Sequence, residues 1–382
     1  MIPKQDPINP VYPFGNKLSF MRSKSISRVN KVLLFFILLF TGLYFASSIL
    51  IPFSFGVLFA MLMHSVANFL ERKGMGTLMS STICTLIVFV VVVGVSIILN
   101  RQLLQFTEDL PEFQKQIAVY YEQARDLVRK EFGVSEAEQE KFVKEQGKDL
   151  AENAGEMIRS AVAGIMSMFL SFMLALIYMF LLLLNRGKYV KILKQLVKGE
   201  HRQTTVAIGK KISKVAQKYL WGRIQVMVLL GIMYLITFLL FGIKYAILLT
   251  IFGTLVTIVP YIGPFVSGIL PILIAIISGK DFTTVMVFAA IVIIIQLIES
   301  YVLEPVLMGS EVNLSPLAII ISIVIGGAIW GLAGMILFVP LLAMAKIYLD
   351  HMENLKPYGM LIGNANPKAT AGFFKKIFQK KS

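Results

Sequence analysis

The sequence is poor in the residues that most often build catalytic and metal sites. Its 382 residues include one cysteine, Cys84, and three histidines that lie far apart in the chain. A disulfide within one chain and a cysteine-based metal site are therefore excluded. The chain also has no HExxH motif, no glycine-rich phosphate loop ending in Lys-Ser/Thr, and no paired aspartates within its apolar runs. We therefore expect neither an enzyme nor a bound cofactor.

Charge is also scarce, and what there is has mostly one sign. Charged residues make up 15% and hydrophobic residues 57% of the chain, whereas a soluble domain is about one quarter charged. The mean hydropathy is +0.75, so the composition indicates a lipid environment. The net charge of +15 could indicate a nucleic-acid partner. The basic residues gather in particular connecting segments, which favours membrane topology as their role, with membrane lipid as the partner and no nucleic acid.

Long apolar runs predict an all-α polytopic membrane protein. A helix needs about 20 residues to cross the hydrocarbon core, and eight runs approach or exceed that length: 32–50, 52–70, 77–99, 160–184, 223–242, 245–278, 282–303 and 315–349. We expect about eight membrane segments, of which 245–278 and 315–349 are hairpins broken by glycine and proline. The predicted organisation is a basic N-terminal segment 1–31, three spans in 32–99, a helical insert 100–156, a fourth span in 157–184, a basic amphipathic segment 185–222, a C-terminal membrane domain 223–349 and a basic tail 350–382.

The charges of the connecting segments predict the orientation. Segment 185–223 carries eleven Lys/Arg against one acid, whereas the insert 100–156 carries eight against thirteen. By the positive-inside rule, the basic segments and both termini are cytoplasmic and the insert is extracytoplasmic. Each broken run must then return the chain to its starting side. We interpret each as a hairpin, either re-entrant or made of two short tilted spans.

The two breaks are the first candidate site. Irregular backbone is tolerated at membrane depth where it lines a cavity or is buried in protein, and paired, interrupted short segments indicate a transport site. The first break would enter from outside and the second from the cytoplasm, so re-entrant tips would meet near the midplane. The residues that would present free carbonyls and helix ends there are Pro260, Gly263, Pro264, Gly327 and Gly331. The alternative is packing, since Gly327-xxx-Gly331 and Gly56-xxx-Ala60 suit close helix contact.

The second candidate is a polar face on the span 282–303. Gln296, Glu299 and Ser300 have i, i+3 and i+4 spacing, so they share one face of a helix. An acid within a span is costly unless it faces protein or water. Glu299 could therefore couple an ion or proton, or it could reach the headgroups from near the cytoplasmic end. Glu304, in the following loop, suits a gate or a simple helix-end contact.

Two segments outside the spans are predicted to be helical. In 185–222, Ile208, Ile212, Val215 and Tyr219 fall on one helical face with lysines beside it, which predicts an interfacial helix facing anionic lipid. The insert carries helix-start signals at Asp109–Glu112 and at Ser135. We expect a helical hairpin that packs on the membrane domain or on neighbouring subunits; a ligand-binding lid is the alternative.

A set of motifs in the C-terminal half resembles a known family. In chain order they are Tyr219–Gln225, Pro260-Tyr261-Ile262-Gly263-Pro264, Glu304–Gly309, Leu314-Ser315-Pro316-Leu317, Trp330–Met335 and Val339-Pro340. In order and spacing they resemble the autoinducer-2 exporter family, also called PerM-like permeases. The resemblance implies a permease of the bacterial inner membrane and a homo-oligomer. Members are associated with export of the signalling molecule autoinducer-2, and some with sodium/proton exchange.

Three functions follow as expectations. The first is a secondary permease that exports a small polar solute, such as a quorum-sensing signal, through a site at the two broken hairpins. The second is a sodium (cation)/proton antiporter with Glu299 as the coupling carboxylate. The third is a non-transporting membrane scaffold that uses the outer insert. Replacing Glu299 by Gln should abolish antiport but only weaken uncoupled solute flux, which separates the first two.

Overall fold

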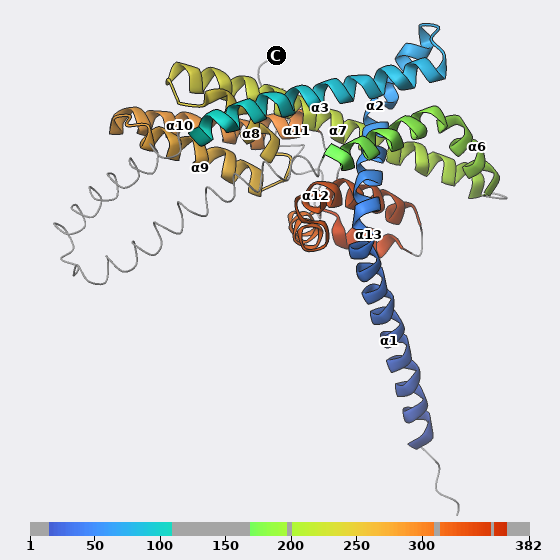
Figure 1. Ribbon diagram of the computed structural model, residues 1–382. Coiled ribbons are helices and arrows are strands. Elements are labelled where there is room, and N and C mark those ends of the chain that lie inside the picture. Colours follow the sequence, from blue (N-terminus) through green and yellow to red (C-terminus); the bar gives the residue numbers. More distant parts are fainter. Residues whose placement is uncertain (1–14, 109–168, 197–200, 309–313, 353–354, 365–382) are drawn as a thin grey trace, which may run out of the picture. The chain divides into compact units, whose positions relative to one another are not determined.

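The computed structural model describes residues 15–108, 169–196, 201–308, 314–352 and 355–364. Within these ranges the regular elements are all helices (Figure 1). Two compact units can be distinguished, Met1–Leu50 and Ile51–Ser382, and each is described by itself. The helices are α1 (Gly15–Phe45), α2 (Ser47–Arg72), α3 (Thr77–Glu108), an unlabelled helix Phe169–Leu184, α6 (Arg186–Leu196), α7 (His201–Leu240), α8 (Ala246–Val256), α9 (Ile262–Ile277), α10 (Phe282–Ile298), the π-helix η1 (Glu299–Leu303), α11 (Glu304–Leu307), α12 (Pro316–His351) and α13 (Lys356–Ile362).

Five of the described helical stretches are long and apolar enough to cross a membrane. They are Ser47–Arg72, Thr77–Phe106, Val206–Leu240, Phe282–Leu307 and Pro316–His351. The pair Phe169–Leu184 and Arg186–Ile192, bent by 65°, makes a sixth if it is counted as one span. The expected helical membrane protein is confirmed, but eight spans are not. The apolar helices Asn30–Phe45, α8 and α9 are too short, because even 16 residues of helix reach only about 24 Å.

The first unit contributes the helix α1, whose apolar part is Asn30–Phe45. The sequence predicted the boundary between the first two spans, 32–50 and 52–70, at residue 51. The structure instead interrupts the helix at Ala46 and places Pro52 inside α2. Backbone N–H groups of Ile49 and Leu50 donate to the Ala46 carbonyl, so the chain resumes helical geometry at once and needs no wider turn.

Helices α8 and α9 form a helical hairpin in the second unit. A Cβ atom added at Gly253 of α8 would lie 3.4 Å from the Ser267 Cβ of α9. Gly263, in the first turn of α9, packs directly on the backbone of Thr257. A buried apolar cluster joins this hairpin to α7 and α10 and includes Tyr234, Phe238 and Phe288, each fully buried. The hairpin is therefore held by close backbone contact within it and by aromatic packing around it.

Helix α12 is long enough to cross a membrane by residue count, but it folds back on itself at Gly331. Gly331 has φ 59° and ψ −141°, a backbone region that is essentially restricted to glycine. The backbones of Gly326 and Gly334 are in direct contact across this bend. The Trp330 and Phe338 rings meet edge to face at 5.3 Å between centroids. Of the predicted break positions, Gly331 is therefore the bend, while Gly326 and Gly327 remain helical.

The basic segment is continuous with a span and is covered by protein. Helix α7 runs unbroken from His201 to Leu240. Ile208, Val215 and Tyr219 are buried, and Tyr219 belongs to an apolar cluster with Ile323 and Val339 of α12. The prediction that this face meets lipid is therefore wrong. In the described part of α7 the lysine-bearing side is exposed, because the folded α12 offers apolar partners to the face that the sequence assigned to lipid.

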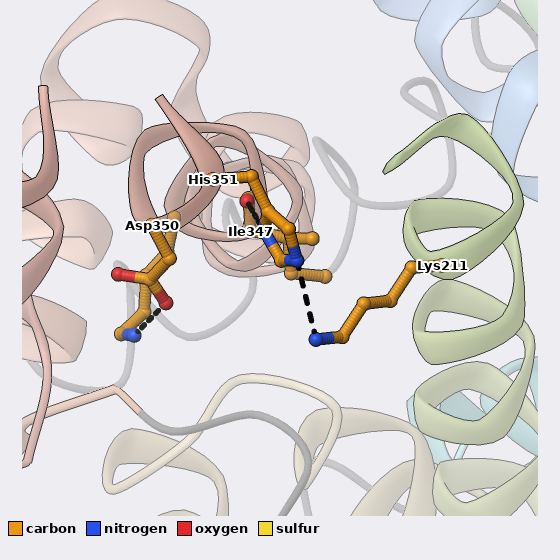
Figure 2. Close-up of polar contacts among 5 residues, drawn as sticks. Lys211, Ile347, Asp350 and His351 are labelled. Carbon is orange, nitrogen blue, oxygen red and sulfur yellow. Dashed lines mark hydrogen bonds and ion pairs between the residues drawn. The ribbon is translucent and has the colours of Figure 1, made fainter. Parts of the chain in front are cut away.

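A polar contact also joins α7 to the end of α12. Lys211 Nζ lies 3.3 Å from His351 Nε2, and His351 Nδ1 lies 2.7 Å from the Ile347 carbonyl (Figure 2). The carbonyl can only accept, so Nδ1 carries the proton and Nε2 accepts from the lysine. Asp350 pairs beside it with Lys346 at 2.5 Å. Lys211, one of the exposed lysines of α7, thus connects this helix to the end of α12.

Helix α2 packs closely on the helix Phe169–Leu184. A Cβ atom at Gly56 would lie 2.6 Å from the Tyr178 Cβ, so the close helix contact predicted at Gly56 is confirmed. Trp221 of α7 donates from Nε1 to the Leu62 carbonyl at 3.0 Å. The structure extends α3 to Glu108, beyond the predicted end of that span at 99. The rest of the predicted insert, 109–156, lies outside the described residues, as do residues 365–382 of the tail.

Candidate functional site

Polar side chains from three helices converge on the start of α9. The Gln296 Nε2 of α10 donates to the Pro264 carbonyl, and the Ser267 hydroxyl donates to the same oxygen at 3.3 Å. The Tyr234 hydroxyl of α7 lies 3.3 Å from the Ser267 Oγ. Tyr234 and Ser267 are buried. We call these four residues the Pro264 cluster.

The local sequence explains how the cluster assembles. Pro260 and Pro264 lack the N–H that a continuous helix would need, so the chain breaks between Val256 and Ile262. Gly268 provides the room for Gln296, because a Cβ atom there would collide with the Gln296 amide. A glutamine inside an apolar span can therefore reach across to the backbone of the broken hairpin instead of facing lipid.

The backbone of the break is itself constrained. Tyr261 has φ 66° and ψ −50°, and a positive φ is uncommon for residues other than glycine. Thr257, fully buried, donates its hydroxyl to the Thr254 carbonyl at 2.7 Å. The Thr257 hydroxyl thus supplies a hydrogen bond to a carbonyl in the last turn of α8, where the helix ends and no further backbone N–H follows in helical register.

Glu299 lies three residues beyond Gln296 and is fully buried. Neither of its carboxylate oxygens has a hydrogen-bond partner among the described residues. Arg223 of α7 and Glu304 of α11 are the charged groups that act on it electrostatically. Arg223 is 4% exposed and bonds from Nη1 to the Glu304 Oε1 at 2.5 Å. We call Arg223, Glu299 and Glu304 the acid–arginine cluster.

The predicted site residues divide into three groups. Pro264 and Gln296 are in direct contact, with Pro260 and Gly263 in the same break. Glu299 and Glu304 belong to the adjacent acid–arginine cluster. Ser300 was predicted to share a helical face with Gln296 and Glu299, but it is exposed. The reason is the π-helix that begins at Glu299, which rotates the following residues relative to an α-helix.

Gly327 and Gly331 form the third group and lie apart from the Pro264 cluster. The atoms nearest a Cβ at Gly327 belong to Met335, and a Cβ at Gly331 would have no atom within 4 Å. The described residues thus show the second bend packed on its own arm. The meeting of the two tips stays a prediction that these contacts do not support.

Three residues of the site were not predicted from the sequence: Arg223, Tyr234 and Ser267. Arg223 carried a usable signal, because it is the last cation before a long apolar run and it follows Trp221-Gly222. Tyr234 and Ser267 carried none, since a tyrosine and a serine in apolar helices are ordinary. Their proximity depends on how α7 and α9 pack.

The described helices define the class of the molecule: a multi-pass helical membrane protein with buried polar groups between its apolar helices. The family described as AI-2E family transporter matches residues 33–354, and the chain belongs to this family.

Curated relatives agree along most of the chain. YueF of Bacillus subtilis (strain 168), whose name describes a transport protein, is 23% identical over 344 residues, which cover 85% of this chain and 90% of YueF. The AI-2 transport protein TqsA of Escherichia coli (strain K12) is 22% identical over 335 residues, covering 86% and 94%. YrrI of Bacillus subtilis, also named as a transport protein, is 30% identical over 139 residues, 36% of this chain and 38% of YrrI. The protein is therefore a membrane transporter, from a family of transport proteins rather than enzymes.

Proposed function

We propose that this transporter exports a small polar solute, with an autoinducer-2-like signalling molecule as its substrate, by a secondary mechanism. The substrate class is supported by the name of the relative TqsA, which aligns along most of both chains. The absence of a phosphate-loop sequence supports a mechanism that does not use ATP directly.

The observation that carries the proposal is the hydrogen bond from Gln296 to the Pro264 carbonyl, beside the buried Glu299. Polar groups buried among apolar helices are costly and are retained where they serve a pathway. Around this bond lie hydroxyl groups of Tyr234 and Ser267, which both donate and accept. A solute rich in hydroxyl groups would find partners of both kinds here.

The proposed placement in the membrane follows from charge and helix length. The basic segments support cytoplasmic termini and an extracytoplasmic insert in a bacterial inner membrane. Helices α8 and α9 are each too short to cross, which supports a re-entrant or tilted hairpin that enters from outside. The α12 hairpin would enter from the cytoplasm. A homo-oligomer remains part of the proposal, in which the exposed apolar residues of α1 and α3 contact either lipid or a second copy of the chain.

The test is flux of labelled autoinducer-2 in proteoliposomes that contain the wild-type protein, Glu299→Gln or the control Ser300→Ala. Ser300 is next to Glu299 in sequence but exposed. We expect flux in wild type, reduced flux in Glu299→Gln and unchanged flux in Ser300→Ala. Folded wild-type protein without solute flux would contradict export. Sodium-dependent proton movement in the same liposomes, lost in Glu299→Gln, would instead identify cation/proton exchange.

A further inference from the structure

One guanidinium is bonded to one carboxylate and acts electrostatically on a second at the cytoplasmic end of the proposed pathway. Arg223 bonds to Glu304 through Nη1, while its Nε and Nη2 are buried without a hydrogen-bond partner among the described residues. Both oxygens of Glu299 are buried and unpartnered in the same way. Unused donors and unused acceptors therefore lie on neighbouring, electrostatically coupled side chains. Leaving such groups unpaired costs free energy, so a second arrangement that pairs them is to be expected.

The π-helix brings the two acids to the same side. The Glu304 backbone N–H donates to the Glu299 carbonyl, which is the five-residue hydrogen bond of a π-helix. Residues five apart in such a turn lie nearly above one another, whereas in an α-helix they would diverge. Helix α7 is also pressed against this turn, because a Cβ at Gly222 would lie 2.7 Å from the Leu307 carbonyl oxygen. Arg223 is thus held within range of both carboxylates.

In the described part of the chain, three tyrosines also interact electrostatically with the cluster. Tyr219 and Tyr234 come from α7 and interact with the cluster through Arg223, Glu304 and Glu299. Tyr261, at the break before α9, interacts with Glu304. None of these groups supplies a second cation. With Arg223 committed to Glu304, a charged Glu299 would be unpaired in a buried position, so this arrangement favours the neutral carboxyl.

We propose that Arg223 alternates between Glu304 and Glu299 and so acts as a two-position switch at the end of the pathway. The existence of the switch does not depend on the proposed function; only the role of the switch in transport rests on it. When the guanidinium moves to Glu299, the carboxyl proton leaves to water and Glu299 becomes the ionised partner. Glu304, whose side chain is 37% exposed, stays ionised and hydrated. The exchange would loosen α7 from α11 and tie it to the end of α10. Arg223 is a positioning residue in this scheme.

The test uses a hydrophobic carbodiimide, dicyclohexylcarbodiimide, which modifies protonated carboxyl groups in apolar surroundings. Modification of Glu299 in the full-length protein is measured at neutral pH by mass spectrometry of the peptide. We expect labelling in wild type and a decrease of about tenfold in Glu304→Gln, because Arg223 then pairs with Glu299 and ionises it. The double variant Glu304→Gln/Arg223→Gln should recover the labelling. The matched control is Glu71→Gln, which removes a carboxylate from the separate Arg186–Glu71 pair and should change nothing.

Each result decides the switch independently of transport. Unlabelled Glu299 in wild type, unchanged labelling in Glu304→Gln, or a double variant that stays unlabelled would overturn it. Arg223→Lys keeps the charge but not the forked geometry. When it is combined with Glu304→Gln, labelling of Glu299 should fall less than in Glu304→Gln alone. If labelling follows this pattern while autoinducer-2 flux is absent, the proposed substrate fails and the switch stands.

Discussion

The two broken apolar stretches look alike in sequence but differ in what surrounds them. Around the first break, side chains of α7 and α10 reach Ser267 and Pro264 with hydrogen-bonding groups. Around the second, glycine meets glycine, and the bend is closed by backbone contact between Gly326 and Gly334. Glycine and proline that interrupt a membrane helix can therefore serve a polar site in one place and close packing in another.

What distinguishes the two breaks is the chemistry of their neighbours. Gln296 can reach the first break because Gly268 leaves space for its amide. At Gly331 a Cβ would meet no described atom within 4 Å, so no described side chain packs against that side of the bend. The first break thus has the character of a site, and the second that of a structural hinge between two packed arms. The predictions below test this division.

The largest effect is expected from Gly334→Val. Its side chain would collide with the backbone of Gly326, and backbone cannot rotate away as a side chain can. We expect the α12 hairpin to open, with a loss of about 3 kcal/mol or more in unfolding free energy. Thermal unfolding in detergent measures it. Gly94→Val is the matched control, since a Cβ there meets no atom within 4 Å; equal loss in both variants would refute the packing role.

The next effect concerns the bend itself. Gly331→Ala places a Cβ on a residue with φ 59° and ψ −141°, so we expect strain of about 1–3 kcal/mol in the folded state. Solute flux per folded molecule should nevertheless stay at the wild-type level. The measurement is flux normalised to the monodisperse fraction, together with the melting temperature. Loss of flux in well-folded Gly331→Ala would move the second break into the site and end the distinction.

At the first break, we expect the reverse of Gly331→Ala: Gln296→Leu should lower solute flux and leave stability nearly unchanged. It removes the donor to the Pro264 carbonyl but keeps a side chain of similar size. We expect flux to fall about tenfold, because a solute would lose one hydrogen-bonding group at the site. The melting temperature should change little, because the Pro264 carbonyl keeps the Ser267 hydroxyl as a donor. Ser300→Ala on the exposed side of the same segment is the control. If Gln296→Leu transports normally, the Pro264 cluster is structural and the site lies elsewhere.

Sequence patterns predicted the helical membrane class, because runs of apolar residues report lipid directly. They also found both breaks, since glycine and proline act locally on the backbone. They could not separate the roles of Gly331 and Gly263, because those roles depend on which helix packs nearby. Arg223 and Tyr234 were missed for the same reason. The apolar face of 185–222 was assigned to lipid because periodicity shows that a face is buried, not what buries it.

The smallest effect compares the starts of the two helices that carry these regions. Asp281 caps α10: its carboxylate accepts from the Thr284 N–H at 2.9 Å and from the Thr284 hydroxyl at 2.7 Å. The Thr284 backbone bond, followed by the hydroxyl bond, lowers the pKa of Asp281. Ser315 caps α12 through a hydroxyl that accepts from the Ala318 N–H at 3.2 Å and does not titrate in this range.

A lowered folded-state pKa means that the Asp281 cap stabilises α10 fully above the ordinary aspartate pKa, about 3.9, and loses that contribution as pH falls through the folded value. Hydrogen exchange, corrected for its intrinsic pH dependence, should therefore become faster in the first turn of α10 on acidification. The first turn of α12 should not change. Asp281→Asn keeps a neutral cap and should remove the pH dependence at α10. If both first turns loosen together in acid, the carboxylate is not the cause and a wider loss of structure is responsible.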